Sequence, residues 1–505
     1  MIDFLSRHRA LLLIMALSLG LKLLFLWQAE VVNPDSATYI AAAQKHAQGL
    51  YSEGLRYYQM PFYPLVLAGV HAVVPNWIYA GQLLTVVPLV LCLWPLYELT
   101  RRVFDQQVAV ATSLLFAVLP AFNTTATSIK RDPLFMLFSL VAVLFMIIAY
   151  QDDRLRWWLW FSLFSVFSIL TRVEGVMIPA IAVVFVPFFR PVGYSDRKTS
   201  LWRFFIMVGL VPLFLVVVMT GLKLAGIDTL SRLNEVAIWG RHLVSQRFFL
   251  EYQELMEKLK VFQETLPHAD LHNNLIETVR HYAPLIYLLG LMEMLGKIIF
   301  PTSLLALWAK RWSTMKTETR GRWLLVAVCL ATILLNLVFS VKRNFTTERY
   351  LWLAGVCLLP WVGSGIMTCW QRYQAKRMVL LLVFLLFIGA PLAKTLSVAA
   401  EKQDHSVVEA GRWLQRYDRD EKMVILYNDR RLPLYANRAE DVRWIRNLAW
   451  LKRHARKKKD VTLVALYVSN KKNEDTAIDG FEPLKIFAGH KKTVLLLQRK
   501  GSSDN

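Results

Sequence analysis

Long apolar runs dominate the first four-fifths of the chain. Each is close to the roughly 20 residues that a helix needs to cross a bilayer. The first run, Leu11–Trp27, follows a short basic segment, and no small-residue cleavage site comes after it. We therefore interpret it as a retained helix and not as a signal peptide. The pattern predicts about eleven spanning helices, at residues 10–29, 78–98, 107–122, 133–150, 157–171, 176–189, 203–225, 282–309, 323–341, 350–370 and 378–396.

Basic residues in the loops predict the orientation of these helices. If the N-terminus is cytoplasmic, every cytoplasmic loop is basic, as the positive-inside rule requires. The apolar segment Pro61–Val74 is short and is bracketed by prolines. If it spanned the membrane, the following arginine pairs would face outward, so we predict a helix on the membrane surface. The main outer regions are then a first loop, residues 30–77, and a long loop, residues 226–281.

The last hundred residues have a different pattern. Val407–Arg416 and the basic segment Arg443–Lys459 have helical patterns, whereas residues 423–427, 461–468 and 493–498 are short apolar runs typical of strands. The sequence thus predicts an all-α polytopic membrane domain, residues 1–396, with juxtamembrane helices, followed by a small soluble α/β domain, residues 397–505. An odd number of spans places this second domain outside the cytoplasm.

Composition excludes several function classes. The chain has 505 residues, 55% of them hydrophobic, and a net charge of +22. The charge is scattered over loops, so it indicates membrane orientation and not nucleic-acid binding. The four cysteines lie inside apolar runs, and the pair His268 and His272 has no acidic third ligand nearby. We therefore predict no metal, no cofactor and no disulfide framework.

Ionisable residues gather at the predicted outer ends of the helices. Each alone could be an ordinary helix-end charge, but together they place acids among several cations near membrane depth, where charges are costly. They are Asp35, Lys130, Arg131, Asp132, Arg172, Glu174, Lys342, Arg343, Glu348 and Arg349.

Sugar transfer from a phosphate carrier requires this combination of groups. An acceptor hydroxyl is a poor nucleophile, so a carboxylate must take its proton. The departing phosphate gathers negative charge, which fixed arginines stabilise. The lipid tail of the carrier needs an apolar groove at the same depth.

Five short motifs support this interpretation. In order, they are Asp35-Ser36-Ala37-Thr38-Tyr39 with Gly49 and Met60-Pro61-Phe62-Tyr63-Pro64, then Leu99-Thr100-Arg101-Arg102, Ser128-Ile129-Lys130-Arg131-Asp132-Pro133-Leu134, Leu170-Thr171-Arg172-Val173-Glu174-Gly175 and Glu348-Arg349-Tyr350-Leu351. Over residues 1–400 the chain resembles membrane glycosyltransferases of the GT-C fold. It is most similar to the branch that holds protein O-mannosyltransferases and the aminoarabinose transferase acting on lipid A. It departs from that branch at Ser36, where many relatives have a second acid, and at Met60, where they have proline.

The resemblance implies an inverting, metal-independent transfer from a polyprenyl-phosphate-linked sugar to an acceptor hydroxyl on the outer face of a bacterial inner membrane. It implies that Asp35 is the general base and that Asp132 assists. The residues expected to bind the donor phosphate or the acceptor are Lys130, Arg131, Arg172, Glu174, Lys342, Arg343, Arg349, Tyr350, Tyr39 and Arg56. The expected partners are the donor lipid, membrane lipids and a protein, lipid or glycan acceptor.

Three alternatives stay open at this point. A flippase of lipid-linked sugars would also span the membrane, although transporters tend to have internal repeats, and none is visible here. A surface-polysaccharide polymerase or ligase is chemically close and would use the long loop, residues 226–281, as its main catalytic element. Asp35 could also be a helix N-cap, since Asp is favoured there.

Overall fold

The chain is mainly helical and forms two compact units. The computed structural model describes residues 9–28, 31–152, 154–188, 197–227, 249–265, 270–309, 319–401, 404–420, 422–439, 445, 447–470 and 476–501. Unit 1 comprises residues 1–21, 87–123 and 131–396, and unit 2 comprises residues 22–86, 124–130 and 397–505.

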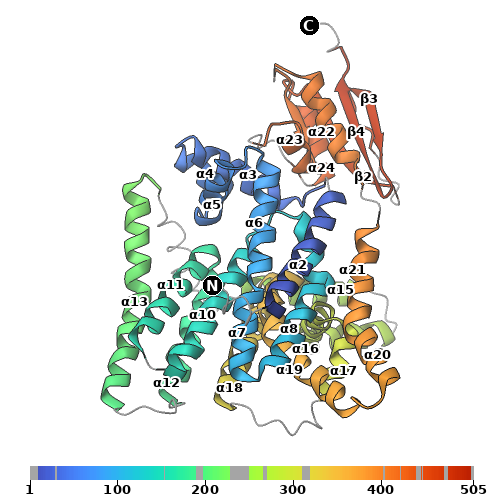
Figure 1. Ribbon diagram of the computed structural model, residues 1–505. Coiled ribbons are helices and arrows are strands. Elements are labelled where there is room, and N and C mark those ends of the chain that lie inside the picture. The colour runs from blue at the N-terminus through green and yellow to red at the C-terminus, as the bar shows by residue number, and fades with distance from the viewer. Residues whose placement is uncertain are drawn as a thin grey trace. The chain divides into compact units, whose positions relative to one another are not determined.

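Unit 1 is a bundle of apolar helices (Figure 1). Its elements, including three helices shared with unit 2 (α2, α6 and α21), are α2 (Arg9–Gln28), α6 (Trp77–Leu91), α7 (Leu93–Val103), α8 (Gln106–Val118), α9 (Pro120–Asn123), α10 (Asp132–Asp152), α11 (Leu155–Thr171), η2 (Val173–Val176), α12 (Met177–Phe188), α13 (Arg197–Leu224), α15 (Leu250–Thr265), α16 (Asp270–Ile299), α17 (Pro301–Ala309), α18 (Thr319–Arg343), η5 (Glu348–Leu351), α19 (Trp352–Arg372), α20 (Arg377–Phe384), η6 (Leu385–Gly389) and α21 (Ala390–Ala399).

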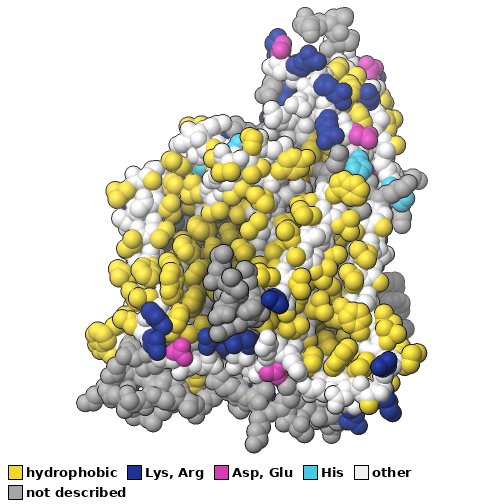
Figure 2. Space-filling model, in the orientation of Figure 1, with side chains coloured by type: hydrophobic (Ala, Val, Ile, Leu, Met, Phe, Trp, Pro, Cys, Tyr) yellow, Lys and Arg dark blue, Asp and Glu magenta, His cyan; other side chains and the backbone are white. Residues whose placement is uncertain are grey.

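The length and composition of these helices confirm a multi-pass membrane protein. Among the described residues, seven helical stretches are long and apolar enough to cross a bilayer, and the pair Gln106–Val118 and Pro120–Thr127, bent by 57°, can add an eighth. Shorter apolar helices include Leu155–Thr171 and Val208–Leu224. Figure 2 shows that hydrophobic side chains cover most of the visible face of the helical part. Such a surface suits a lipid environment.

Small residues allow close packing inside the bundle. The core includes Leu115 and Phe116 of α8 and Val356 of α19. A Cβ atom on Gly363 would collide with Thr112 of α8, and one on Gly365 would collide with the backbone of Ala306 in α17. Helix α19 therefore approaches both neighbours at a distance that only glycine permits, as is common between membrane helices.

Two predicted spans are broken in the structure, residues 107–122 between α8 and α9 and residues 282–309. Residues 282–309 were expected to form a single helix, but α16 ends at Ile299 and α17 begins at Pro301, with Phe300 at φ 76° between them. The residue before proline avoids helical geometry, so the break falls at Phe300. Helix α16 also begins at Asp270, inside the predicted outer loop of residues 226–281. The same loop also contains α15, Leu250–Thr265, whose residues have helical periodicity.

Unit 2 joins the segment after the first helix to the C-terminal residues. The first part contains α3 (Asp35–Ala47), α4 (Tyr51–Tyr57), α5 (Phe62–His71) and η1 (Thr124–Thr127). The second contains α22 (Ser406–Tyr417), β1 (Ile425–Tyr427), α23 (Arg431–Tyr435), α24 (Leu448–Lys457), β2 (Leu463–Ser469), β3 (Phe481–Ala488) and β4 (Lys492–Arg499). Tyr435 Oη accepts a hydrogen bond from the Val32 amide at 2.9 Å, and Arg430 Nη1 donates to Thr38 Oγ1 at 2.9 Å.

The C-terminal residues of unit 2 form a small α/β fold, as predicted. The four-stranded sheet has the order β1-β2-β4-β3, visible in Figure 1. Strands β1 and β2 are parallel, with Ile425 opposite Leu463, and the other pairs are antiparallel. The parallel pair is connected through α24, and Leu451 of that helix lies in the core with Val464 and Leu497. Strand β3 was not predicted, because most of its side chains are exposed and its pattern is not apolar.

Candidate functional site

A buried ion-pair network joins three helix ends in unit 1. Asp132 is the first residue of α10, Arg172 directly follows α11, and Glu174 lies in the 3₁₀ turn η2. Arg172 Nη1 donates to Asp132 Oδ1, and Arg172 Nη2 donates to Glu174 Oε1 at 2.6 Å. Asp132 and Arg172 are 2% and 3% exposed. The arginine is thus held between two carboxylates in a site that excludes most water.

Tight packing of the turn fixes Arg172 and Glu174. The Ser168 and Ser139 hydroxyls are hydrogen bonded to each other at 2.9 Å and tie α11 to α10. A Cβ atom on Gly175 would lie 2.6 Å from the Ser168 carbonyl carbon, so the turn accepts only glycine without a shift. The sequence Arg172-Val173-Glu174-Gly175 therefore folds back on α11 and directs both charged side chains toward α10.

Aromatic rings surround the network. The Arg172 guanidinium carbon lies 4.5 Å from the ring centre of Tyr350 and 5.5 Å from that of Phe135. The Arg349 guanidinium carbon lies 5.5 Å from the Tyr350 ring. Asn336 of α18 donates to the Tyr350 carbonyl at 3.0 Å and holds η5 in place. Tyr350 thus lies within cation–π distance of two arginines.

The charges of the network reinforce one another. Burial alone would raise the pKa of Glu174, but the charge of Arg172 and its hydrogen bonds lower that pKa to about 2. Burial alone would lower the pKa of Arg172, yet Glu174 and Asp132 raise it well above its usual value. Glu174 and Arg172 therefore stay ionised at neutral pH. No described residue forms a hydrogen bond with Asp132 Oδ2, which leaves one carboxylate oxygen for a ligand.

Further predicted cations lie next to this network or close to Tyr350. Arg131 Nη1 donates to the Thr171 carbonyl at 3.3 Å. Lys342 and Arg343 form the last turn of α18, and the Arg343 guanidinium carbon lies 5.3 Å from the Phe339 ring. The Phe339 ring meets Tyr350 edge-on at 5.7 Å. Unit 1 therefore contains eight of the predicted site residues. The sequence analysis missed Phe135 and Asn336, which have no ionisable group to mark them.

The remaining predicted site residues belong to unit 2. Asp35 is the first residue of α3, and the N-cap is Pro34, so the interpretation of Asp35 as an N-cap is wrong. Tyr39 is buried, with its ring 4.9 Å from the rings of both Tyr58 and Tyr63. This aromatic cluster fixes the N-terminal part of α3. Arg56 is exposed on α4, and the Lys130 amide donates to Thr85 Oγ1 at 3.3 Å.

Two other sequence predictions concern individual side chains. Glu293 and Lys297, one helical turn apart in α16 as the sequence indicates, form an ion pair at 2.7 Å. Among the described residues, no group of His, Cys, Asp and Glu is arranged to hold a metal ion. His268 lies outside the described residues, so its predicted relation to His272 cannot be followed.

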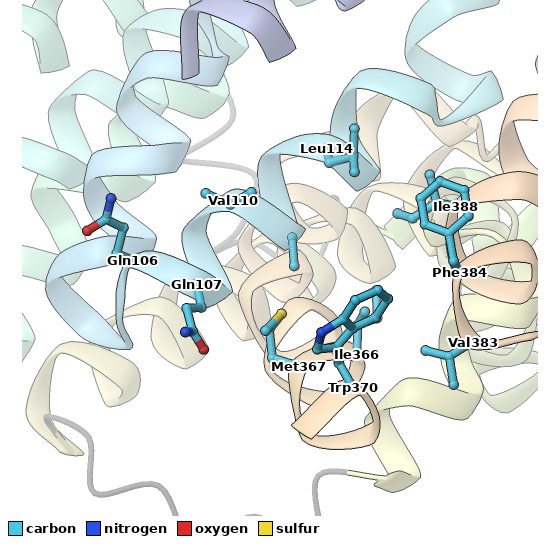
Figure 3. A pocket seen from close by; sticks show the side chains of 11 residues that line it. Gln106, Gln107, Val110, Leu114, Ile366, Met367, Trp370, Val383, Phe384 and Ile388 are labelled. Carbon is cyan, nitrogen blue, oxygen red and sulfur yellow. The ribbon is translucent and has the colours of Figure 1, made fainter. Parts of the chain in front are cut away.

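A cavity lies at the opposite end of α19 from Tyr350. It has a volume of about 610 Å³ and is lined mainly by apolar side chains of α8, α19 and α20. Figure 3 shows Met367 and Trp370 on α19 facing this space, with Phe384 across from them. Twenty residues of helix separate Tyr350 from Trp370, which corresponds to roughly 30 Å. The cavity has no ionisable lining residue, so it offers no acid–base chemistry.

The comparisons with known proteins agree with this fold. The family model for dolichyl-phosphate-mannose-protein mannosyltransferase matches residues 59–220. No curated protein matches the sequence. The structure is similar to ArnT from Cupriavidus metallidurans in its apo state, with a TM-score of 0.58, 15% identity and coverage of 97% of this chain and 98% of ArnT.

Two further solved structures contain carrier lipids. The complex of the same ArnT with undecaprenyl phosphate gives a TM-score of 0.56 and 14% identity, with 97% of this chain and 98% of ArnT covered. The archaeal oligosaccharyltransferase AglB from Archaeoglobus fulgidus, in complex with an inhibitory peptide and a dolichol-phosphate, gives a TM-score of 0.56 and 13% identity, with 90% of this chain and 69% of AglB covered. At these identities the likeness establishes the fold. The family model covers about a third of this multi-pass membrane protein, and the solved structures show that the chain has the GT-C fold of membrane glycosyltransferases.

Proposed function

We propose that the protein transfers a sugar from a polyprenyl-phosphate-linked donor to an acceptor hydroxyl on the outer face of the membrane, with inversion and with Asp35 as general base. One observation carries this proposal. The segment that matches the mannosyltransferase family model, residues 59–220, contains Asp132, Arg172 and Glu174, and these three form a single buried network.

The nature of the donor is supported by chemistry and by the neighbours. Undecaprenyl phosphate and dolichol-phosphate are the lipids bound in two similar structures. A phosphate leaving group needs cations held in place before the reaction. Arg349, Lys342 and Arg343 lie around Tyr350 and Phe339 at the ends of α18 and η5. We assign these cations to the carrier phosphate, together with Lys130 and Arg131.

Arg172 has a different role in this proposal. Two carboxylates already neutralise its charge, so it is poorly suited to bind a further anion. Its guanidinium instead fixes Asp132 and the face of Tyr350. Asp132 keeps one oxygen available, and we assign it to an acceptor or sugar hydroxyl. Arg172 and Glu174 are then positioning residues.

The contacts within unit 2 support a proposal for the side of the membrane on which the C-terminal residues lie. The first loop and residues 397–505 are hydrogen bonded within one unit, so they lie on the same side of the membrane. The basic cytoplasmic loops put the first loop outside. We therefore propose that the C-terminal α/β fold is extracytoplasmic and that the enzyme works in the inner membrane of a bacterium.

Cells lacking the protein test this function. Mass analysis of their lipid extract should show accumulation of one polyprenyl-phosphate sugar, and the surface glycans should lose the same sugar. The wild-type protein should restore both, whereas Asp35→Asn should restore neither. Unchanged lipid-linked sugars and unchanged glycans would contradict the proposal. Accumulation of the sugar carrier on the cytoplasmic leaflet alone would favour a flippase.

A further inference from the structure

A polar pocket lies in unit 2 beside the segment that carries Asp35. Its volume is about 320 Å³. Its walls come from the segment before α3, from the residue after η1 and from the C-terminal fold. The polar lining residues are Asn33, Ser128, Asp404, Arg431, Tyr467, His490 and Lys491. Asn33 is two residues before Asp35, which limits the separation of their Cα atoms to about 7 Å.

Two acids near the pocket already accept hydrogen bonds from neighbouring groups of the protein. Asp404 accepts hydrogen bonds from the amides of Ser406, Lys491 and Lys492 and from the Ser406 hydroxyl, at 2.6 to 3.2 Å. Asp429 accepts from Nε and Nη2 of Arg431 at 2.9 and 2.8 Å. The first acid shapes the loop that carries Lys491, and the second fixes Arg431.

Arg431 and Tyr467 form a rigid wall of the pocket. The Arg431 guanidinium carbon lies 4.9 Å from the centre of the Tyr467 ring, and Lys492 Nζ lies 4.6 Å from the same ring. Arg431 is 12% exposed, so part of its guanidinium remains accessible. Because Asp429 already takes Nε and Nη2 of Arg431, this arginine shapes the wall of the pocket, and its position is fixed before a ligand binds.

The other polar groups of the pocket offer donors. Asn33 Oδ1 accepts from Ser36 Oγ at 2.6 Å and from the Ile129 amide at 2.9 Å, which orients its Nδ2 as a donor. Within the described part of the chain, the structure gives no hydrogen-bond partner for Asn33 Nδ2, Ser128 Oγ or Lys491 Nζ. The donors of Asn33 and Ser128 and the ammonium group of Lys491 favour a ligand that accepts hydrogen bonds and carries negative charge.

We propose that this pocket binds an anionic group, phosphate or carboxylate, carried by an acceptor glycan, and so selects the acceptor. The inference rests on the proposed glycosyl transfer. The donor lipid needs an apolar groove, whereas this pocket is built by the soluble C-terminal fold. An acceptor held here would place a neighbouring hydroxyl close to Asp35.

Binding of small sugars to the full-length protein in a neutral detergent tests the proposal. The probes are glucose 6-phosphate, glucuronate and uncharged glucose. Saturation-transfer NMR measures the binding of each. Both anionic sugars should bind at least about tenfold more tightly than glucose, because one charge-assisted hydrogen bond accounts for such a factor. Binding of one anionic sugar alone identifies phosphate or carboxylate as the natural group.

Lys491→Glu is the decisive variant. It keeps the backbone hydrogen bond to Asp404 and should weaken both anionic probes about tenfold or more. Lys459→Glu makes the same charge change at an exposed position outside the pocket and should bind like wild type. Equal binding by the two variants, or binding of glucose as tight as that of the anionic sugars, would overturn the proposal.

The same assay separates this inference from the proposed function. Asp35→Asn should bind the anionic probes like wild type, because binding needs no general base. Retained binding without sugar transfer by the wild-type protein would contradict the enzyme function alone. Sugar transfer that proceeds equally well in Lys491→Glu and Lys459→Glu would contradict the acceptor pocket alone.

Discussion

Glu174 offers a test of the buried network at the level of one residue. Its pKa is lowered from 4.5 to about 2, so its ion pair stabilises the folded protein fully above about pH 4.5. That contribution should be lost as the pH falls from 4.5 toward 2. The difference in melting temperature between wild type and Glu174→Gln in detergent should be constant from pH 7 to pH 5 and should shrink by pH 3. A difference that does not depend on pH would show that the ion pair contributes nothing.

Among the predicted cations, we expect Arg349 to contribute most to binding the carrier phosphate. Arg349→Ala should lower kcat/KM by roughly 10²-fold, the usual loss for one donor to a developing oxyanion. Arg349→Lys should recover only part, because a point charge cannot form the planar pair. Arg372→Ala is a matched control, since Arg372 also lies beside a tyrosine ring but at the other end of α19. Wild-type kinetics in Arg349→Lys would rule out a bidentate contact.

At the scale of elements, the turn from α11 to η2 depends on Gly175. A methyl group there would meet the Ser168 backbone at 2.6 Å, so Gly175→Ala must displace Arg172 and Glu174. We expect a loss of about 1–3 kcal/mol in stability, the usual cost of overpacking, and a larger fall in activity. Gly290→Ala in α16 is the control, because no atom lies within 4 Å of its added Cβ. The melting temperatures and transfer rates of both variants test this prediction. Equal values for Gly175→Ala and Gly290→Ala would contradict the role of the turn.

Helix positions followed from the sequence wherever an apolar run ended in charges or proline. The runs that became α10 and α19 begin at Asp132 and just after Glu348-Arg349. The break at Phe300 was not predicted, although Pro301 marks it, because the run is apolar on both sides and hydropathy alone indicates one continuous helix. Strand β3 was missed for the opposite reason, since Glu482, Lys485 and their neighbours give it the pattern of a loop.

The same limit applies to the candidate site. Charges at helix ends and short motifs were enough to select Asp132, Arg172, Glu174 and Tyr350, which the structure brings together. The sequence could not indicate that Arg172 is saturated by two acids, because that depends on how α10 and α11 pack. It also could not indicate that Lys491 and Asn33, far apart in the chain, line one pocket.

At the scale of the whole molecule, the orientation of unit 2 is the first test. A reporter that is active only in the cytoplasm, fused after Asn505, should be silent in bacterial cells, whereas the same reporter fused after Arg102 in a truncated chain should be active. The physical reason is that the first loop and the C-terminal fold share one unit. Activity of the reporter after Asn505 would place this unit, with Asp35, on the cytoplasmic side and would contradict the proposed site of transfer.

Release of polyprenyl phosphate by the purified protein tests the central claim most directly. The wild-type protein, supplied with lipid-linked sugars and surface glycans extracted from cells lacking it, should release the carrier phosphate and lengthen the glycan by one sugar. Asp35→Asn should fold and melt like wild type while losing roughly 10²–10⁴ in rate, because Asn cannot accept a proton. Glu53→Gln, which changes a half-exposed acid of α4 that pairs with Lys45, should remain active. A well-folded Asp35→Asn protein that transfers sugar at the wild-type rate would contradict the account.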